Sequence, residues 1–367
     1  MRGTQALNPS ADVRRVVLAL ASGLVPEPGI CSEWTTDHLK VVRAESVSPW
    51  LYISLKDHTD VGLDPAILAD LRQDYRASAI RVIQREAALR QLLVAFDSHG
   101  IPLLLLKGAY LGRFVYNDPA LRPMLDLDLL VRDEHFEQAC EELERLGYRL
   151  SVELDPEEER LLKLPRVYGY SGSPPEFIDL HRCIRSMGYY ELRSDILWDN
   201  AIEGELYGCR VFYLSPELNF IHLALHNLNH RGDLRDWVDL VLLMRALNPD
   251  WDRLIALARS LGVMRPLFWI FHELSEDWET RAPADLWAAL ASYTPRPLED
   301  RVIRGRFAYF WRVIARIERL DGWSARARYL RKKLAAPVGQ PDTGSFERLT
   351  DYLRSKVTLF RRLWRRG

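Results

Sequence analysis

The chain has 367 residues, 48% of them hydrophobic and 28% charged, an ordinary globular composition that is long enough for two or three domains. Its four cysteines are widely separated and form no CxxC pair, which argues against a disulfide framework or a zinc site and indicates a reducing compartment. The apolar run at 16–25 is about half as long as a membrane-spanning helix, and no clear cleavage site follows it. We therefore expect a cytoplasmic protein without a membrane span.

The net charge of −1 hides an uneven distribution. Residues 301–367 carry 18 Lys and Arg against 5 Asp and Glu, a net charge of +13, which leaves −14 for residues 1–300. Such asymmetry indicates a basic surface that meets phosphate, nucleic acid, a membrane or an acidic partner.

Helical patterns fill the first part of the chain. Apolar residues recur at three- and four-residue spacings, most clearly at 65–96, so we expect an N-terminal helical region over 1–95. An α/β core is expected over 96–185. In this core the apolar run at 101–106 predicts a buried strand that ends in a glycine turn, and the alternation at 125–131 predicts a second strand.

The chain is predicted to turn helical again after Asp179. Residues 186–334 form a predicted helical domain, and a linker rich in proline and glycine separates it from a basic C-terminal helix at 345–367. That helix could bind RNA, an acidic peptide or a membrane surface, or it could pack on its own domain. The fold class is therefore α+β, with a small mixed-sheet core flanked by large N- and C-terminal helical regions.

Two carboxylates lie close together on the second predicted strand. Asp126 and Asp128 are two residues apart, so their side chains point to the same face of the strand. Paired carboxylates in an apolar setting repel each other and are costly to desolvate, which favours a bridging cation. Oxygen ligands at this spacing suit Mg²⁺ or Mn²⁺ better than Zn²⁺. The alternative is two polar residues at the end of a strand that face water.

A third carboxylate follows in the strand-like segment 177–181. Asp179 is flanked there by apolar residues and would join Asp126 and Asp128 if the two strands are neighbours. Three converging acids are typical of a two-metal phosphoryl-transfer site.

These features occur in a recognisable order along the chain. A strand that ends in a glycine turn, a helix, an Asp-x-Asp strand and a later lone Asp resemble the nucleotidyltransferase superfamily of DNA polymerase beta. Over about residues 80–250 the chain is more closely similar to the family of uncharacterised nucleotidyltransferases. The segments that carry this similarity are LKG at 106–108, LRPMLDLDLLV at 121–131, IDLH at 178–181, HLALHNLNH at 222–230 and LRDWVDL at 234–240.

The resemblance implies a nucleotidyltransferase with a nucleoside triphosphate (NTP) as co-substrate. Asp126, Asp128 and Asp179 would be its catalytic carboxylates and would hold Mg²⁺ or Mn²⁺. Gly108 would form the turn beneath the triphosphate. An acceptor hydroxyl, deprotonated by Asp179 or by a nearby acid or histidine, would attack the α-phosphorus and expel pyrophosphate.

One position departs from the superfamily pattern. Ala109 follows the glycine, where a Gly or Ser usually holds the nucleotide phosphates. We therefore expect Lys107, Arg113 or Arg122 to supply the missing donors, and we favour Arg122 because it lies on the approach to the aspartates. Arg122 could instead be a surface-loop arginine. His181 is a further candidate for cofactor binding.

A histidine stripe lies on the helix expected from residue 216. His222, His226 and His230 are four residues apart and share one face, so they could bind a metal, line the nucleotide cleft or pack in a helix seam. Asp236 and Asp239 on the following helix are three residues apart. One of them could orient a histidine or act as a general base, or both could be surface acids.

We expect a metal-dependent nucleotidyltransferase that moves a nucleoside monophosphate to a hydroxyl-bearing acceptor. A small molecule or a peptide or protein side chain is the favoured acceptor, an RNA end stays open, and residues 186–334 would shape the acceptor pocket. One alternative is a catalytically idle nucleotide-binding module, prompted by Ala109. The other is an RNA- or acidic-partner-binding protein that uses its basic C-terminus.

Overall fold

The computed structural model of the protein describes residues 8–151, 166–170, 176–186, 190–230, 233–277, 283–293 and 303. Apart from residues 190 and 303, they belong to one compact unit, and a second unit comprises 154–164, 187–190 and 294–367. The basic helix predicted at 345–367 and the linker before it lie outside the described residues. The division of the chain into four functional regions stays a prediction.

Helices form the N-terminal part, as the sequence predicted. They are α1 (Pro9–Ala21), α2 (Thr36–Ala44), α3 (Ser48–Leu55) and α4 (Pro65–Ser98), with the short 3₁₀ helix η1 (Thr59–Val61) before α4. The start of α4 shows why the chain becomes helical at this point. Pro65 occupies the first helical position, and the Asp64 carboxylate accepts a hydrogen bond from the Ala66 amide at 2.7 Å.

A seven-stranded mixed sheet is the centre of the described structure and confirms the predicted α+β class. Its strand order is β3-β4-β5-β2-β1-β9-β8. The strands are β1 (Leu104–Leu105), β2 (Leu127–Leu130), β3 (Arg149–Leu150), β4 (Arg166–Tyr170), β5 (Glu176–His181), β8 (Ala201–Leu206) and β9 (Cys209–Leu214). β2 runs parallel to β5 and β1 runs parallel to β9, whereas β1 and β2 are antiparallel. A separate two-stranded sheet joins β6 (Ile184–Ser186) to β7 (Tyr190–Leu192).

The prediction that the chain turns helical after Asp179 is wrong. β6, β7, β8 and β9 come first, and β9 pairs with β1, so that Leu104 lies opposite Phe212 in the sheet. The sequence feature that indicates these strands is the two-residue hairpin turn Tyr207-Gly208 between β8 and β9. Tyr207 and Gly208 both have positive φ angles, of 55° and 78°, as a tight hairpin requires.

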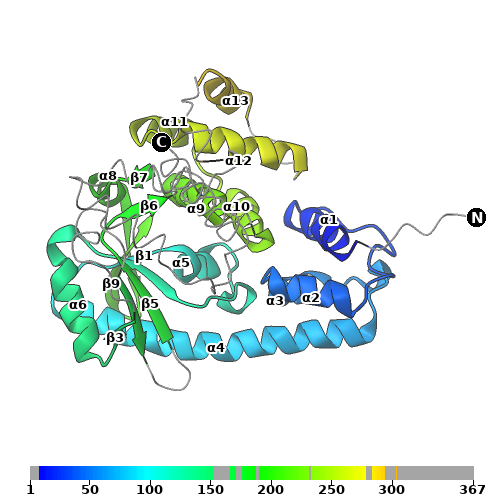
Figure 1. The fold of residues 1–367 in the computed structure, drawn as a ribbon, viewed down its shortest axis with the longest axis horizontal. Coiled ribbons are helices and arrows are strands. Elements are labelled where there is room, and N and C mark those ends of the chain that lie inside the picture. Colours follow the sequence, from blue (N-terminus) through cyan, green and yellow to red (C-terminus); the bar gives the residue numbers. More distant parts are fainter. Residues whose placement is uncertain are drawn as a thin grey trace, which may run out of the picture. The chain divides into compact units, whose positions relative to one another are not determined.

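Helices support the sheet and carry the elements of the site. α4, cyan in Figure 1, packs against α3 and also against β9 and α6 (Phe136–Arg145), so it joins the N-terminal helices to the sheet. α5 (Lys107–Phe114) follows β1 directly and packs on β2. Every residue of β1 and β2 is buried, which explains their nearly continuous apolar sequence. The 3₁₀ helices η2 (Pro119–Leu121) and η3 (Asp133–His135) flank β2.

The described C-terminal part is helical. It consists of α9 (Pro216–His230), α10 (Leu234–Leu247), α11 (Trp251–Ser260), α12 (Met264–Asp277) and α13 (Ala284–Ala291), whereas the short helix α8 (Ser194–Asp199) precedes β8. α9 starts where the sequence predicted, because the Ser215 hydroxyl accepts a hydrogen bond from the Leu218 amide at 3.4 Å and Pro216 follows it. α9 packs against α10, α11, α12 and β9. None of the helices in the described residues is long and apolar enough to cross a membrane.

Candidate active site

Two parallel strands bring two of the predicted carboxylates together. The register of β2 and β5 pairs Asp128 with Asp179, and residues paired in this way project to the same face of a sheet. His181 lies two residues further along β5 and therefore points to that face as well. One ligand atom from each of Asp128, Asp179 and His181 lies within 4.8 Å of the others. These three side chains form the centre of the candidate site.

Asp128 is buried and already has two partners. Its Oδ1 accepts a hydrogen bond from Lys107 Nζ at 2.6 Å and lies 3.2 Å from His181 Nε2. Burial alone would raise the pKa of the Asp128 carboxyl, but the Lys107 ammonium and the His181 imidazole together hold that pKa below its ordinary value. Asp128 is therefore ionised, and Lys107 belongs to the carboxylate cluster.

The ionised forms of Asp126 and Asp179 are destabilised by burial and by the neighbouring carboxylate charges. Burial and the charge of Asp128 raise the pKa of Asp126, and burial together with Asp128 and Asp126 raises the pKa of Asp179 to about 6. A bound cation would relieve this repulsion. The donors are mainly carboxylate oxygens, so they fit Mg²⁺ or Mn²⁺. Asp126 precedes β2 and stands beside the converging set rather than within it.

The turn between β1 and α5 differs from the predicted glycine turn. The left-handed backbone conformation falls on Lys107, with a φ of 40°, and not on Gly108. Gly108 is needed for close packing instead. A Cβ atom at this position would clash with Met124 and would lie 2.6 Å from Arg122 Nη1. Gly108 thus allows the loop that leads to Asp126 to pack directly on α5.

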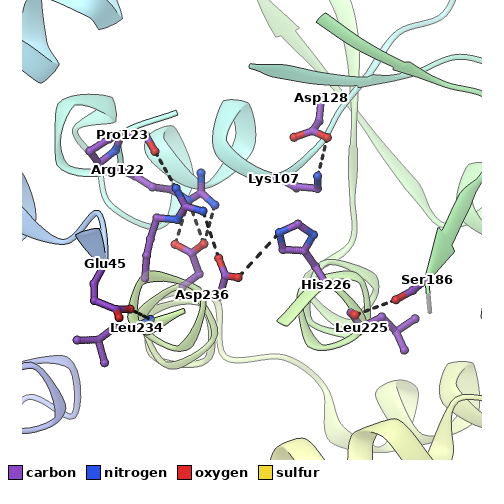
Figure 2. Close-up of polar contacts among 12 residues, drawn as sticks. Glu45, Lys107, Arg122, Pro123, Asp128, Ser186, Leu225, His226, Leu234 and Asp236 are labelled. Atoms are coloured by element: carbon purple, nitrogen blue, oxygen red, sulfur yellow. Dashed lines mark hydrogen bonds and ion pairs between the residues drawn. The ribbon is translucent and has the colours of Figure 1, made fainter. Parts of the chain in front are cut away.

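Arg122 is buried, which excludes the surface-loop interpretation. Its Nε donates to both carboxylate oxygens of Asp239 on α10 at 2.9 and 3.0 Å, and its Nη2 donates to Oδ2 at 2.7 Å. The Tyr116 hydroxyl donates to the same carboxylate at 2.7 Å. Arg122 therefore ties the loop before β2 to α10 (Figure 2). A contact between Arg122 and the nucleotide phosphates stays a prediction.

His222 of α9 lies near the carboxylate cluster, and His226 of α9 lies near α10. His222 is buried with no hydrogen bond to its Nδ1, and burial together with the nearby Lys107 lowers the pKa of His222 to about 3. His226, one turn later, has its Nε2 3.9 Å from Asp236 Oδ2 on α10 (Figure 2). The side chain of His230 lies outside the described residues. Within the described part of the chain, the α9 histidines belong to no group that could hold a metal.

Sequence reasoning missed Arg85. This side chain of α4 is buried and donates a hydrogen bond to the carbonyl of Met124, two residues before Asp126. The sequence pattern that could have revealed Arg85 is its spacing four residues before Leu89. This spacing places it on the buried face of α4, where an apolar residue is usual. An arginine at such a position needs an acceptor in the core, and here it holds the loop before β2.

The sequence of the chain matches a known protein family. A family model described as an uncharacterised nucleotidyltransferase matches residues 32–276, which include β2, β5, α9 and α10. The chain belongs to this nucleotidyltransferase family. No curated protein matches the sequence of this nucleotidyltransferase.

Solved structures resemble about half of the nucleotidyltransferase. The solution structure of the antibiotic-resistance factor ANT(2'')-Ia shares 15% identity at a TM-score of 0.37, and the match covers 52% of this chain and 98% of that one. The crystal structure of ANT(2'')-Ia in complex with adenylyl-2''-tobramycin shares 17% identity at a TM-score of 0.35, covering 49% and 97% of the respective chains.

Replacing Asp239 by alanine tests the buried ion pair of the nucleotidyltransferase. The substitution leaves the Arg122 guanidinium buried without its carboxylate, so we expect the free energy of unfolding to fall by about 3–5 kcal/mol in urea denaturation. Asp97→Ala on the exposed end of α4 is the matched control and should change it by less than about 0.5 kcal/mol. A loss below about 1 kcal/mol for Asp239→Ala would contradict the role of this pair.

Asp236→Asn tests the electrostatic state of the second acid on α10. Burial, with the charge of Asp239 next, raises the pKa of Asp236 from 3.8 to about 6. A raised carboxyl pKa means that the folded protein binds more protons, so this group destabilises the wild type as pH rises from about 4 through about 6. The free energy of unfolding of Asp236→Asn relative to the wild type should therefore increase by about 2–3 kcal/mol as the pH rises across this range, at 1.36 kcal/mol for each pKa unit. Urea denaturation at pH 4, 5, 6 and 7 measures this, and a difference that does not vary with pH would exclude it.

Proposed function

We propose that this nucleotidyltransferase uses Mg²⁺ or Mn²⁺ to move a nucleoside monophosphate from an NTP to a hydroxyl-bearing acceptor. The observation that supports it best is the parallel register that sets Asp128 against Asp179. Buried Asp128 and half-buried Asp179 are held there at the same place on the sheet, with His181 beside them and Asp126 next to them. Such a set has no evident structural use and is costly to keep without a cation.

In this proposal Asp128 and Asp179 hold the ion, and Asp126 adds negative charge beside it. A bound divalent ion supplies charge neutralisation and polarisation of the phosphate oxygens. His181 keeps Asp128 oriented through the 3.2 Å contact. The acceptor oxygen forms a bond to the α-phosphorus as the bond to the pyrophosphate oxygen breaks, and Asp179 or a nearby acid or histidine takes the hydroxyl proton.

The start of α5 is the proposed place for the triphosphate. Lys107 supplies an ammonium group beside the carboxylates, and the N-terminus of α5 has no side-chain cap, so its amide groups can meet phosphate oxygens. Gly108 lets Met124 and Arg122 pack against the start of α5, because a side chain there would clash with both residues. Arg122 contributes by holding the loop, and its Nη1 lies on the Gly108 side.

The acceptor in this proposal is a small molecule or a peptide or protein side chain, bound by the helices that follow the sheet. His222 of α9 lies near enough to the carboxylates to be influenced by their charge, and His226 of α9 lies 3.9 Å from Asp236 of α10. The proposed location is the cytoplasm, where NTPs are available, and the four buried cysteines form no disulfide, in line with a reducing compartment.

A transfer assay tests the proposal. The purified protein is incubated with Mg²⁺ or Mn²⁺, each of the four α-³²P NTPs and a cell extract, and the label transferred to any acceptor is counted. We expect Asp128→Asn and Asp179→Asn to lower the transfer rate on the order of 1,000-fold, because charge stabilisation by the ion is worth several kcal/mol.

The control for this assay is Asp97→Asn, which lies on the exposed end of α4 and should transfer label at the wild-type rate. Wild-type protein that binds NTP but transfers no label would favour an idle nucleotide-binding module. Transfer that survives in both Asn variants would refute the assignment of the carboxylates.

A further inference from the structure

Two buried acids on α10, Asp236 and Asp239, lie three residues apart and differ in their hydrogen-bond partners. Asp239 is completely buried and receives hydrogen bonds from Arg122 and Tyr116. Asp236 is only 3% exposed, yet neither of its carboxylate oxygens has a hydrogen bond. Arg235 Nη2 lies 3.5 Å from one carboxylate oxygen of Asp236 and His226 Nε2 lies 3.9 Å from the other, distances within ion-pair range but without a hydrogen bond.

An unsatisfied buried carboxylate calls for a functional explanation. Buried polar atoms in native proteins nearly always have hydrogen-bond partners, and those that do not are often completed by a ligand or used in catalysis. Among the described residues, Asp236 is the one carboxylate with both oxygens buried and without a hydrogen bond. Asp239 forms the buried ion pair with Arg122, whereas Asp236 forms no hydrogen bond within the protein. Asp236 can therefore accept hydrogen bonds from a ligand.

The helix pair that carries Asp236 holds further unsatisfied groups. Arg235 Nε on α10 is a buried donor without a hydrogen bond, and Nδ1 of His222 on α9, a donor or an acceptor depending on the tautomer, is buried without one as well. The packed pair of α9 and α10 therefore presents both buried acceptors and buried donors. A hydroxyl group, which donates one hydrogen bond and accepts others, is the natural complement of such a set, and an amino group matches the carboxylate.

The position of Asp236 relative to the carboxylate cluster fits an acceptor. His222 is close enough to the cluster that Lys107, Asp128 and His181 all act on its charge. His226, which faces Asp236, follows four residues later on the same side of α9, a rise of about 6 Å. Figure 2 shows the His226 ring and the Asp236 carboxylate facing each other between α9 and α10. A molecule held there would lie about one turn of α9 from His222, the histidine whose pKa the carboxylate cluster influences.

We propose that Asp236 binds the acceptor of the nucleotidyl transfer and selects a small molecule with hydroxyl or amino donors, uncharged or cationic. The inference rests on the proposed function and specifies its acceptor class. Hydroxyl or amino groups of the acceptor molecule donate hydrogen bonds to the two carboxylate oxygens of Asp236. These bonds orient the acceptor hydroxyl that attacks the α-phosphorus. A polyanion such as an RNA end is disfavoured, because its phosphates would lie against the buried Asp236 carboxylate, and like charges in contact repel each other.

The test separates possible acceptors by charge. The small-molecule fraction of a cell extract is divided by ion exchange into anionic, neutral and cationic pools. Each pool, and a separate RNA oligonucleotide with a free 3′-hydroxyl, is incubated with the protein, Mg²⁺ and α-³²P NTP. We expect label in the neutral or the cationic pool, and which of the two it enters distinguishes a polyol from an amine-bearing acceptor.

Asp236→Asn then tests the residue itself. The pool concentration for half-maximal transfer should rise about 10- to 100-fold, as for the loss of a hydrogen bond to a charged group, while the Kd for NTP stays unchanged. Asp236→Ala should show the same split between acceptor and NTP. Asp233→Asn, an exposed residue just before α10, is the matched control and should leave both quantities unchanged.

Several outcomes would overturn the inference. Label in the anionic pool or in RNA refutes the acceptor class, as does the absence of transfer to any pool when NTP is bound. An unchanged half-maximal concentration in both Asp236 variants refutes the role of the residue, and an equal loss of NTP binding shows that its role is structural. Failure of the wild type to bind NTP in the presence of Mg²⁺ removes the proposed function together with the inference.

Discussion

The parallel pairing of β2 with β5 is the constraint on which the site depends. Its register sets Asp128 opposite Asp179, and a shift by one residue would turn one of the two carboxylates to the other face of the sheet. The surrounding strands are buried, so the repulsion between these acids is weakly screened. Lys107 compensates part of the charge, and His181 contacts the same oxygen of Asp128. The rest of the charge explains why the cluster suits a divalent cation.

The loop before β2 is held from two sides, which keeps Asp126 near the cluster. Arg85 of α4 binds the carbonyl of Met124, and Arg122 forms a buried pair with Asp239 of α10. Gly108 lets the loop pack on α5 between these two anchors. Helices from the N-terminal and C-terminal parts of the chain thus determine the position of one short loop at the site, and the catalytic core of this family member depends on both.

The polar side chains of α9 and α10 divide into supporting and unsatisfied groups. Asp239 has a full set of donors and supports the fold, whereas Asp236 and His222 are buried with hydrogen-bonding capacity left over. Unsatisfied groups of this kind lower stability, and the pKa of Asp236, raised to about 6 by burial and by Asp239, is one expression of that cost. Their concentration on α9 and α10 is the basis of the proposed acceptor site.

The sequence by itself determined the local features of this protein. Periodicity predicted the N-terminal helical region with α4, the Ser215-Pro216 pair marked the start of α9, and the apolar alternation located β2 with Asp128 in it. Only the tertiary structure decided the partners: β9 beside β1, Lys107 on Asp128, Arg122 on Asp239 rather than in solvent, and Asp236 without a hydrogen bond. The reason is physical. Periodicity and capping act over a few residues and show which way a side chain points, but strand pairing and buried charge pairs join segments far apart in the chain, and many such pairings are compatible with one local pattern.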